Sequence, residues 1–318
     1  MKRFLYSHGR ICLVIVLLLT LLPGCFVPAP APPGASPGPG AAEKPPSSPA
    51  PPPSTPAEPA RPALSVHVID VGQGDGILVK LPDGRTMLVD AAEPGKGKVV
   101  VAYLKAEGVS KIDYLVATHP HSDHIGGMAE VVRAFAVGDV YMPKTGHTSA
   151  HYEEFLRELK KRDLKVNEAR KGVRVLDTGG LSISFIAPSG KNYAELNDWS
   201  AVARIEYGDA IILLTGDAGA RSEQEMLLAS EVSPRADVLK VGHHGSGTSS
   251  SAGFLKAVSP SYAIISVGAG NAFGHPSERT LARLHAAGAR VYRTDLHGTV
   301  VVETDGKAIS VRHARKGD

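Results

Sequence analysis

The stretch that decides the fold is His119-Pro120-His121-Ser122-Asp123-His124. It brings three imidazoles and one carboxylate together within six residues, directly after the apolar run 114–118. That run predicts a short buried strand, so the polar side chains would be held on a rigid rim, and proline would stiffen the turn. Imidazole and carboxylate are ligands that Zn, Mn and Fe accept in proteins. The segment therefore predicts a metal site at the end of a strand.

Two other apolar runs end in the same way. The run 210–215 leads into Gly216-Asp217, and the run 238–241 leads into Gly242-His243-His244-Gly245. Glycine at such a position lets the backbone approach a metal closely. Three strand ends that deliver His, Asp and His to one rim are far more specific than any one of them.

The order of the remaining patterns indicates layered α/β architecture, because strands and helices are interleaved. Proline, aspartate and glycine at 82–84 mark a turn between two strands. Strands are expected at 65–70, 76–81, 86–90, 114–118, 181–187, 201–207, 210–215, 238–241, 262–267, 291–293 and 299–303, followed by a charged tail. Helices are expected at 98–107, 126–135, 151–162, 220–230 and 277–287.

The first 24 residues have the pattern of a secretory signal. Lys2, Arg3 and Arg10 form a positive region before the apolar run 11–22, which is too short to span a bilayer comfortably. The sequence before Cys25 resembles a bacterial lipobox, which predicts a lipoprotein anchored to a membrane on the outer side. The alternatives are an ordinary signal peptide or a short membrane anchor.

Residues 25–63 are expected to be a lipidated cysteine followed by a disordered linker. Prolines dominate this segment, and such a composition favours extended polyproline II rather than a packed core. Residues 64–318 are then expected to form one folded domain. The only cysteines are Cys12 and Cys25, so the domain has neither a disulfide nor a thiolate ligand.

Charge argues modestly against tight binding of duplex nucleic acid. Loss of the three basic residues of the signal leaves 32 basic and 32 acidic side chains, since residues 1–24 contain no Asp or Glu. Proteins that grip many phosphates are usually basic. A local basic groove remains compatible with this balance.

The combined motifs resemble the metallo-β-lactamase superfamily, an αββα sandwich with metals at one edge between two sheets. The segments resemble in particular the C-terminal hydrolase domain of ComEC-type competence proteins, over nearly all of 64–300. The shared segments are 70–75, 119–124, 197–200, 215–217, 239–246 and 274–277. We expect no multi-helix membrane channel of the ComEC type within the sequence given.

The resemblance implies two divalent metal ions, Zn or Mn, and a role for each ligand. His119 and His121 would bind the first ion, and Asp217 would bridge both ions. The second would be held by Asp123, His124 and His243, with Asp123 also taking part in catalysis. Many members supply a third histidine to the first site, but this chain offers Asn197 in the matching region.

Other residues near these motifs receive weaker roles. His244 and His275 are expected either to protonate a leaving group or bind a phosphate oxygen, or else only to pack behind the ligands. Ser246 and Asn271 are expected to contact substrate. Asp75 is expected to order the glycine-rich turn at 72–76, and Trp199 to pack at the rim of the site.

The resemblance implies hydrolysis of a phosphodiester, with DNA, including single-stranded DNA, as the expected substrate. The chain would then be an extracytoplasmic nuclease linked to uptake or degradation of DNA, anchored to the membrane through Cys25, with no protein partner evident. A hydrolase of a lactone, a β-lactam or a small phosphodiester on the same scaffold is one alternative. A non-catalytic lipoprotein that captures DNA is another.

Overall fold

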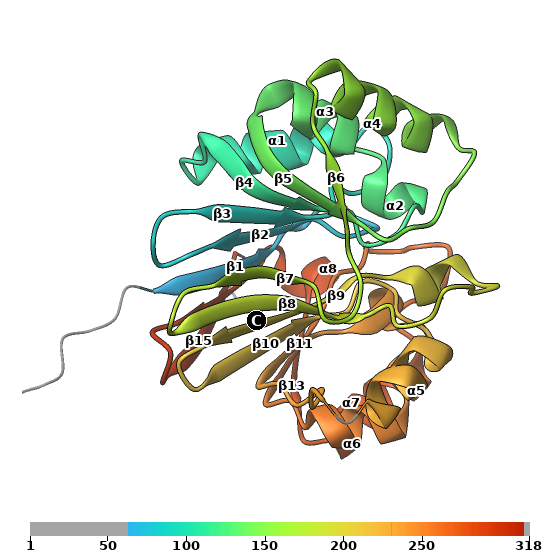
Figure 1. The fold of residues 1–318 in the computed structure, drawn as a ribbon. Coiled ribbons are helices and arrows are strands. Elements are labelled where there is room, and N and C mark those ends of the chain that lie inside the picture. Colours follow the sequence, from blue (N-terminus) through green and yellow to red (C-terminus); the bar gives the residue numbers. More distant parts are fainter. Residues whose placement is uncertain (1–62, 230, 315–318) are drawn as a thin grey trace, which may run out of the picture. The chain divides into compact units, whose positions relative to one another are not determined.

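Two mixed β-sheets pack face to face, and helices cover the outer face of each (Figure 1). This arrangement is seen in a computed structural model that describes residues 63–229 and 231–314. The eight-stranded sheet has the order β15-β14-β1-β2-β3-β4-β5-β6 and the seven-stranded sheet the order β13-β12-β11-β10-β9-β8-β7. The expected αββα sandwich is therefore confirmed.

The strand bounds place the first half of the domain and its last two strands in one sheet. The eight-stranded sheet contains β1 Leu64–Val68, β2 Ile77–Lys80, β3 Thr86–Val89, β4 Lys111–Val116, β5 Ala136–Met142, β6 Val166–Glu168, β14 Val300–Thr304 and β15 Ile309–His313. The seven-stranded sheet contains β7 Arg174–Asp177, β8 Leu181–Ala187, β9 Val202–Tyr207, β10 Ala210–Leu214, β11 Val238–Lys240, β12 Tyr262–Ile265 and β13 Arg290–Arg293.

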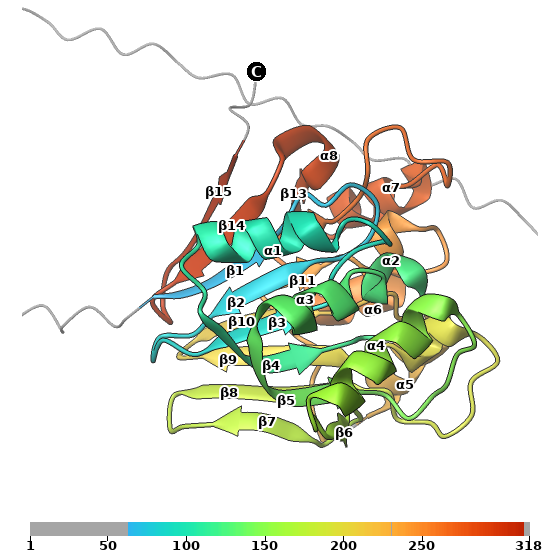
Figure 2. The same cartoon turned by 90° about the horizontal axis from the view of Figure 1, so that it is seen from above.

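The helices divide between the two outer layers. Seen from above, α1, α3 and α4 lie across the outer face of the eight-stranded sheet (Figure 2). The helices α5, α6 and α7 lie on the opposite side of the sandwich (Figure 1). The bounds are α1 Gly97–Ala106, α2 Ser122–Ile125, α3 Met128–Ala134, α4 Ala150–Lys161, α5 Ala220–Leu228, α6 Ala252–Val258, α7 Glu278–Ala286 and α8 Thr294–His297, with 3₁₀ turns η1 Leu196–Trp199 and η2 Gly242–Gly245.

Three apolar clusters match the three interfaces between four layers. Because side chains alternate along a strand, one strand serves two clusters. In β3, Met87 and Val89 join the cluster between the sheets, while Leu88 joins the cluster under α1 and α3. In β10, Leu214 faces the inner cluster and Leu213 the cluster under α5 and α6. Strands buried on both faces explain why their sequences read as continuous apolar runs.

Some sequence expectations were wrong in detail. The helix expected at 126–135 is present as α3, which begins two residues later, at Met128, while the short helix α2 before it was not expected. A Cβ atom on Gly127 would lie 2.2 Å from the carbonyl oxygen of Ala91, so the chain approaches too closely there for any other residue. The segment expected to be a charged tail contains β15, which pairs antiparallel with β14.

The expected signal, Cys25 and the proline-rich linker lie outside the described residues. Within the described part of the chain, no helix is both long and apolar enough to cross a membrane.

Candidate metal centre

The three motifs meet at one edge of the sandwich because three strands end there. The His119–His124 segment follows β4 and leads into α2, and Asp217 follows β10. His243 and His244 lie in η2, directly after β11, which runs parallel to β10. Residues from both sheets thus line one site, as the sequence predicts.

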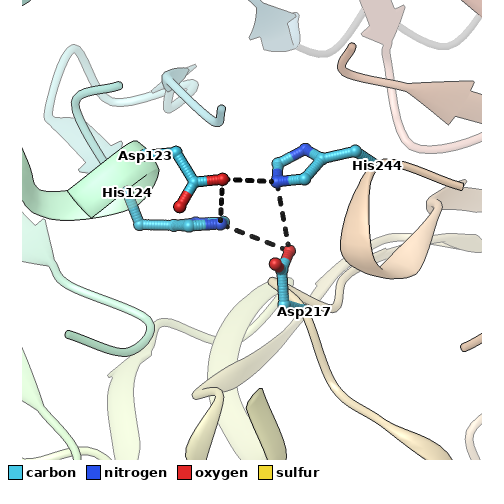
Figure 3. A group of neighbouring side chains, drawn as sticks. All are labelled: Asp123, His124, Asp217 and His244. Carbon is cyan, nitrogen blue, oxygen red and sulfur yellow. Dashed lines mark ion pairs between the residues drawn. The ribbon is translucent and has the colours of Figure 1, made fainter. Parts of the chain in front are cut away.

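Four side chains have ligand atoms that all lie within 4.8 Å of one another, and Figure 3 shows them pointing toward one another. Asp123 and His124 come from α2, Asp217 from the end of β10, and His244 from η2. The Nε2 atom of His124 lies 3.3 Å from Asp217 Oδ1. The Nε2 atom of His244 lies 3.2 Å from Asp123 Oδ2 and 3.6 Å from Asp217 Oδ1. We call these four residues the second ligand set.

These spacings fit a bound cation. Ligand atoms placed about 2.0–2.1 Å from a tetrahedral Zn ion lie about 3.4 Å from one another. His124 Nε2, His244 Nε2 and Asp217 Oδ1 are also buried and make no hydrogen bond within the described protein. Buried polar atoms almost always have a partner. Three such atoms converging on one point therefore fit a site for a divalent metal.

The electrostatics of the second ligand set also favour a cation. Burial alone would lower the pKa of His124, but Asp217, Asp90 and Asp123 raise it well above its usual range. The pKa of His244 is likewise lowered by burial and raised further by Asp217 and Asp123, so that the net shift is upward. The neighbouring carboxylates thus favour the protonated form of these two buried imidazoles. The same negative charges would also favour a bound divalent metal ion.

Asp90 fixes the orientation of His124, a role that the sequence analysis missed. Its Oδ2 atom lies 2.7 Å from His124 Nδ1, and its two oxygens accept hydrogen bonds from the backbone and hydroxyl of Thr118. A carboxylate behind a ligating imidazole is the usual second layer of a metal site, and it leaves Nε2 available to the metal. The signal that could have revealed Asp90 is its place directly after a buried strand, β3, which is the place that the ligand motifs also have.

The two adjacent histidines of η2 have different places from those expected. His244, and not His243, joins the second ligand set, and its Nδ1 atom is 2.9 Å from the carbonyl oxygen of Ser266. His243 is 27% exposed and directs Nε2 toward the other oxygen of Asp217, at 3.7 Å. Both residues have left-handed backbone conformations, which turn the two rings to different sides of Asp217.

His119 and His243 direct Nε2 toward this other oxygen of Asp217, and His121 lies beside His119. We call these three histidines, together with Asp217, the first ligand set. His119 Nε2 lies 3.9 Å from Asp217 Oδ2 and 2.9 Å from His121 Nδ1. The set is less compact than the second one. Asp217 thus faces both sets with different oxygens, as a bridging ligand would.

Asn197, the expected substitute for a third imidazole, lies beside the first ligand set. Its Nδ2 atom is 3.3 Å from His243 Nδ1, and its Oδ1 atom is buried without a hydrogen-bond partner in the described protein. The geometry therefore brings Asn197 and His243 together at this site. His243 is the third imidazole that the sequence analysis placed elsewhere.

The side chain of Asn271 makes its hydrogen bonds within the loop before α7 and is therefore not available for the expected contact with substrate. Its Nδ2 atom donates to the carbonyls of Gly268 and His275, and its Oδ1 atom accepts from the backbone of Phe273 and His275. The ring of His275 lies 5.6 Å from that of His243, so it is next to the first ligand set.

Ser246 is also directed inward. It is buried, and its hydroxyl lies 2.9 Å from that of Thr248. Thr248 is exposed, and its hydroxyl lies 3.3 Å from His243 Nδ1. Of these two residues, Thr248 rather than Ser246 therefore faces solvent beside the site.

Asp75 was expected to order the glycine-rich turn, but its side chain is directed toward Lys240 and His244. Its Oδ2 atom lies 2.9 Å from Nζ of Lys240, and both side chains are only 1% exposed. Its Oδ1 atom lies 3.5 Å from Nδ1 of His244. This buried ion pair stands directly behind the second ligand set. The glycine-rich turn passes very close to the backbone of Asp123, since a Cβ atom on Gly74 would lie 2.1 Å from the carbonyl oxygen of Asp123.

Trp199 packs at the rim, as the sequence analysis expected. Its ring meets that of Tyr193 edge-on, with centroids 5.1 Å apart, and Tyr193 in turn lies under the guanidinium of Arg221. This group fixes η1 and hence the position of Asn197.

Fold and ligand arrangement together define a metallohydrolase, and comparison with known proteins agrees. The model of the metallo-β-lactamase superfamily matches residues 69–269. The chain belongs to this superfamily.

Among curated proteins, the chain is similar to three proteins of bacterial competence and recombination. It is 33% identical over 74% of its length to ComE operon protein 3 of Bacillus subtilis, and 34% identical over 74% to competence protein ComA of Neisseria gonorrhoeae. It is 29% identical over 80% to recombination protein 2 of Haemophilus influenzae. The match covers 32%, 32% and 31% of these proteins, so the chain corresponds to about a third of each.

Solved structures show the same fold at low identity. The diiron β-hydroxylase CmlA of Streptomyces venezuelae superposes with a TM-score of 0.52 and 16% identity, over 76% of this chain and 54% of that one. The chain is thus a hydrolase of the metallo-β-lactamase fold, related to competence proteins and equipped with a His/Asp cluster that fits a metal.

Proposed function

We propose that this chain is a two-metal phosphodiesterase that cleaves single-stranded DNA. The observation that carries the proposal is the division of ligands around Asp217, whose two oxygens face different sets of imidazoles. Two divalent cations held there, Zn or Mn, would lower the pKa of a water molecule and neutralise charge on the attacked phosphate. The similarity to proteins named for competence and recombination supports DNA as the substrate.

The protein's own residues would orient and complete this chemistry. Asp90 and the carbonyl of Ser266 hold His124 and His244 with Nε2 directed into the site. Asp123 is 27% exposed, so it can meet solvent while one oxygen faces His244. His275, beside His243 and half-buried, is placed to give a proton to a leaving oxygen.

The test is to deplete the purified protein of metal, restore Zn or Mn, and assay four substrates in parallel. These are single-stranded DNA, duplex DNA, bis(p-nitrophenyl) phosphate and a chromogenic β-lactam. We expect metal-dependent cleavage of single-stranded DNA that is abolished in Asp217→Asn, because this substitution removes a charge from both ligand sets. Hydrolysis of the β-lactam alone would identify a different hydrolase on this fold. DNA binding without any cleavage would identify a capture protein.

We further propose that the protein acts outside the cytoplasm, tethered by a lipid on Cys25. The supporting observation is the lipobox-like sequence before a long proline-rich segment. Replacement of Cys25 by serine should release the protein from the membrane fraction. An unchanged membrane fraction would contradict the lipid anchor.

A further inference from the structure

An exposed aromatic ring lies close to the first ligand set. Phe273, in the loop between β12 and α7, is 66% exposed. Its ring stacks on that of His275, with centroids 5.8 Å apart and an interplanar angle of 26°. An apolar ring of this size in water is unfavourable unless a partner covers it. We call Phe273 and His275 the aromatic platform.

The loop that carries the platform is braced from within. All four hydrogen bonds of the Asn271 side chain go to backbone groups of this loop, including the N–H groups of Phe273 and His275. The backbone N–H of Gly268 donates to Oε1 of Gln73, which ties the loop to the turn before β2. The platform is therefore held in place before any ligand arrives, which lowers the entropy that binding would cost.

The platform continues into the candidate metal centre. The ring of His275 meets that of His243 at 5.6 Å and 75°, and His243 Nε2 lies 3.7 Å from Asp217 Oδ2. On the other side of His243, the exposed hydroxyl of Thr248 lies 3.3 Å from Nδ1. The exposed ring of Phe273 is thus linked to the first ligand set through two ring contacts, one with His275 and one from His275 to His243. The hydroxyl of Thr248 lies beside the same histidine.

These groups match the parts of one nucleotide. A base has an apolar face that stacks on aromatic side chains, and its phosphate is the group that a two-metal site would bind. Bases in duplex DNA are already stacked on their neighbours, whereas those in a single strand are available. A protein partner would be expected to cover a larger apolar patch than one ring next to a polar site.

We propose that the aromatic platform stacks a base next to the phosphodiester that is cleaved, and so selects single-stranded nucleic acid with bases over a bare sugar-phosphate chain. This inference rests on the proposed function and names how that site recognises its substrate. Stacking of one base on a protein ring by this route does not depend on which base is present, so little sequence preference is expected.

The experiment compares two oligonucleotides of equal length, one of deoxythymidine and one with abasic residues. Dissociation constants are measured by fluorescence anisotropy on phosphorothioate versions, which resist cleavage, and KM and kcat on the ordinary versions. We expect the wild type to bind the base-bearing strand more tightly. Phe273→Ala should raise the Kd for the base-bearing strand about tenfold, which corresponds to about 1.4 kcal/mol. The ratio of the Kd values for the abasic and the base-bearing strands should then approach one.

Matched variants separate stacking from general effects. Phe273→Trp should keep the preference, while Phe273→Leu should lose most of it, because leucine is apolar but has no flat ring. Leu228→Ala removes another exposed apolar side chain, which is 77% exposed at the end of α5, and should leave the preference unchanged.

The outcomes distinguish the platform from the proposed function. If the protein cleaves DNA but Phe273→Ala leaves the affinity ratio unchanged, the platform is wrong and the function stands. If no strand is cleaved but the base-bearing strand still binds better through Phe273, the platform stands and the nuclease is wrong. If the wild type does not distinguish the two strands at all, the platform is wrong regardless of activity.

Discussion

At the scale of single residues, the two histidines of η2 show how the site divides its ligands. They are adjacent in sequence, yet His244 is buried against Asp123 and Asp217, and His243 is partly exposed beside Asn197. Left-handed backbone at both positions makes this possible, a conformation that is unusual for residues other than glycine. Such strain at two neighbouring residues is typical of a functional site.

We predict that single substitutions of these two histidines remove different metal ions. His244→Ala should deprive the second ligand set of an imidazole and leave about one metal ion per chain, bound more weakly at the first ligand set. His243→Ala should weaken the first set, leaving the tighter ion in place, because that set is the less compact of the two. Metal content after dialysis, followed by calorimetric titration, measures both effects.

His275→Ala is the control for this pair, since His275 touches the ring of His243 without facing Asp217 in the same way. It should retain both ions. If calorimetry shows that His243→Ala and His244→Ala lose the same ion and keep the other with the same affinity, the two histidines serve one site together.

At the scale of secondary-structure elements, β11 does two things at once. Its first residues pair with β10 and β12 in the middle of the sheet, and its last residue, Lys240, directs a charged group into the interior. Lys240 Nζ lies 2.9 Å from Asp75 and also donates to the carbonyl of Val241. The strand thereby ties the turn before β2 to η2, across the two sheets.

We predict that Lys240→Met destabilises the fold strongly. Methionine would leave Asp75 as an unpaired buried carboxylate, and loss of one partner of a buried ion pair costs about 3–5 kcal/mol. Urea unfolding at 25 °C measures the change in the free energy of unfolding. The double variant Lys240→Met with Asp75→Asn should recover part of the loss, since no isolated charge remains.

A loss below about 1 kcal/mol in Lys240→Met would contradict this picture, because losses that small are typical of solvent-exposed pairs. Lys111→Met, which removes the exposed partner of Asp113, is a matched lysine control and should have only such a small effect.

The elements themselves were predicted to different degrees. Runs buried on both faces, such as β10 and β11, were evident from composition alone. The strands β5 and β6 were not expected, because their exposed positions interrupt the apolar pattern. The short helix α2, which precedes the helix expected at 126–135, was not predicted either, because its four residues are too few to show a helical apolar pattern.

At the scale of the whole domain, the candidate metal centre joins the two sheets. Asp123 and His124 follow a strand of the eight-stranded sheet, and Asp217 and His244 follow strands of the seven-stranded sheet. A cation bound by all four would connect the two halves of the sandwich. It would also neutralise carboxylates that are buried close to one another.

We predict that metal binding stabilises the domain against heat. At a free metal concentration about 100 times the dissociation constant, binding contributes about 2.7 kcal/mol. For a domain of this size that corresponds to a rise in Tm of roughly 5–10 °C relative to protein in excess chelator. Differential scanning calorimetry with Zn, Mn or chelator measures the shift.

Asp217→Ala should abolish most of this shift, because Asp217 faces both ligand sets. The same Tm with and without metal in the wild type would mean that the cluster does not hold a cation tightly.

The sequence by itself determined the layered fold and the edge at which the site forms. Apolar runs that end in His, Asp and Gly carry this information locally, since a buried strand must end at the rim of its sheet. All seven residues of the two ligand sets lie where that rule places ligands. They are His119, His121, Asp123, His124, Asp217 and the adjacent pair His243 and His244.

Only the tertiary structure decided which histidine of that pair faces which ligands, and which groups stand behind them. The choice between His243 and His244 depends on two left-handed backbone conformations, and the partner of Asp75 is a lysine 165 positions away. Asp90 behind His124, and Phe273 stacked on His275, are likewise contacts made by folding. Spacing along a chain shows which residues can reach one edge, but the directions of their side chains are set by packing around them.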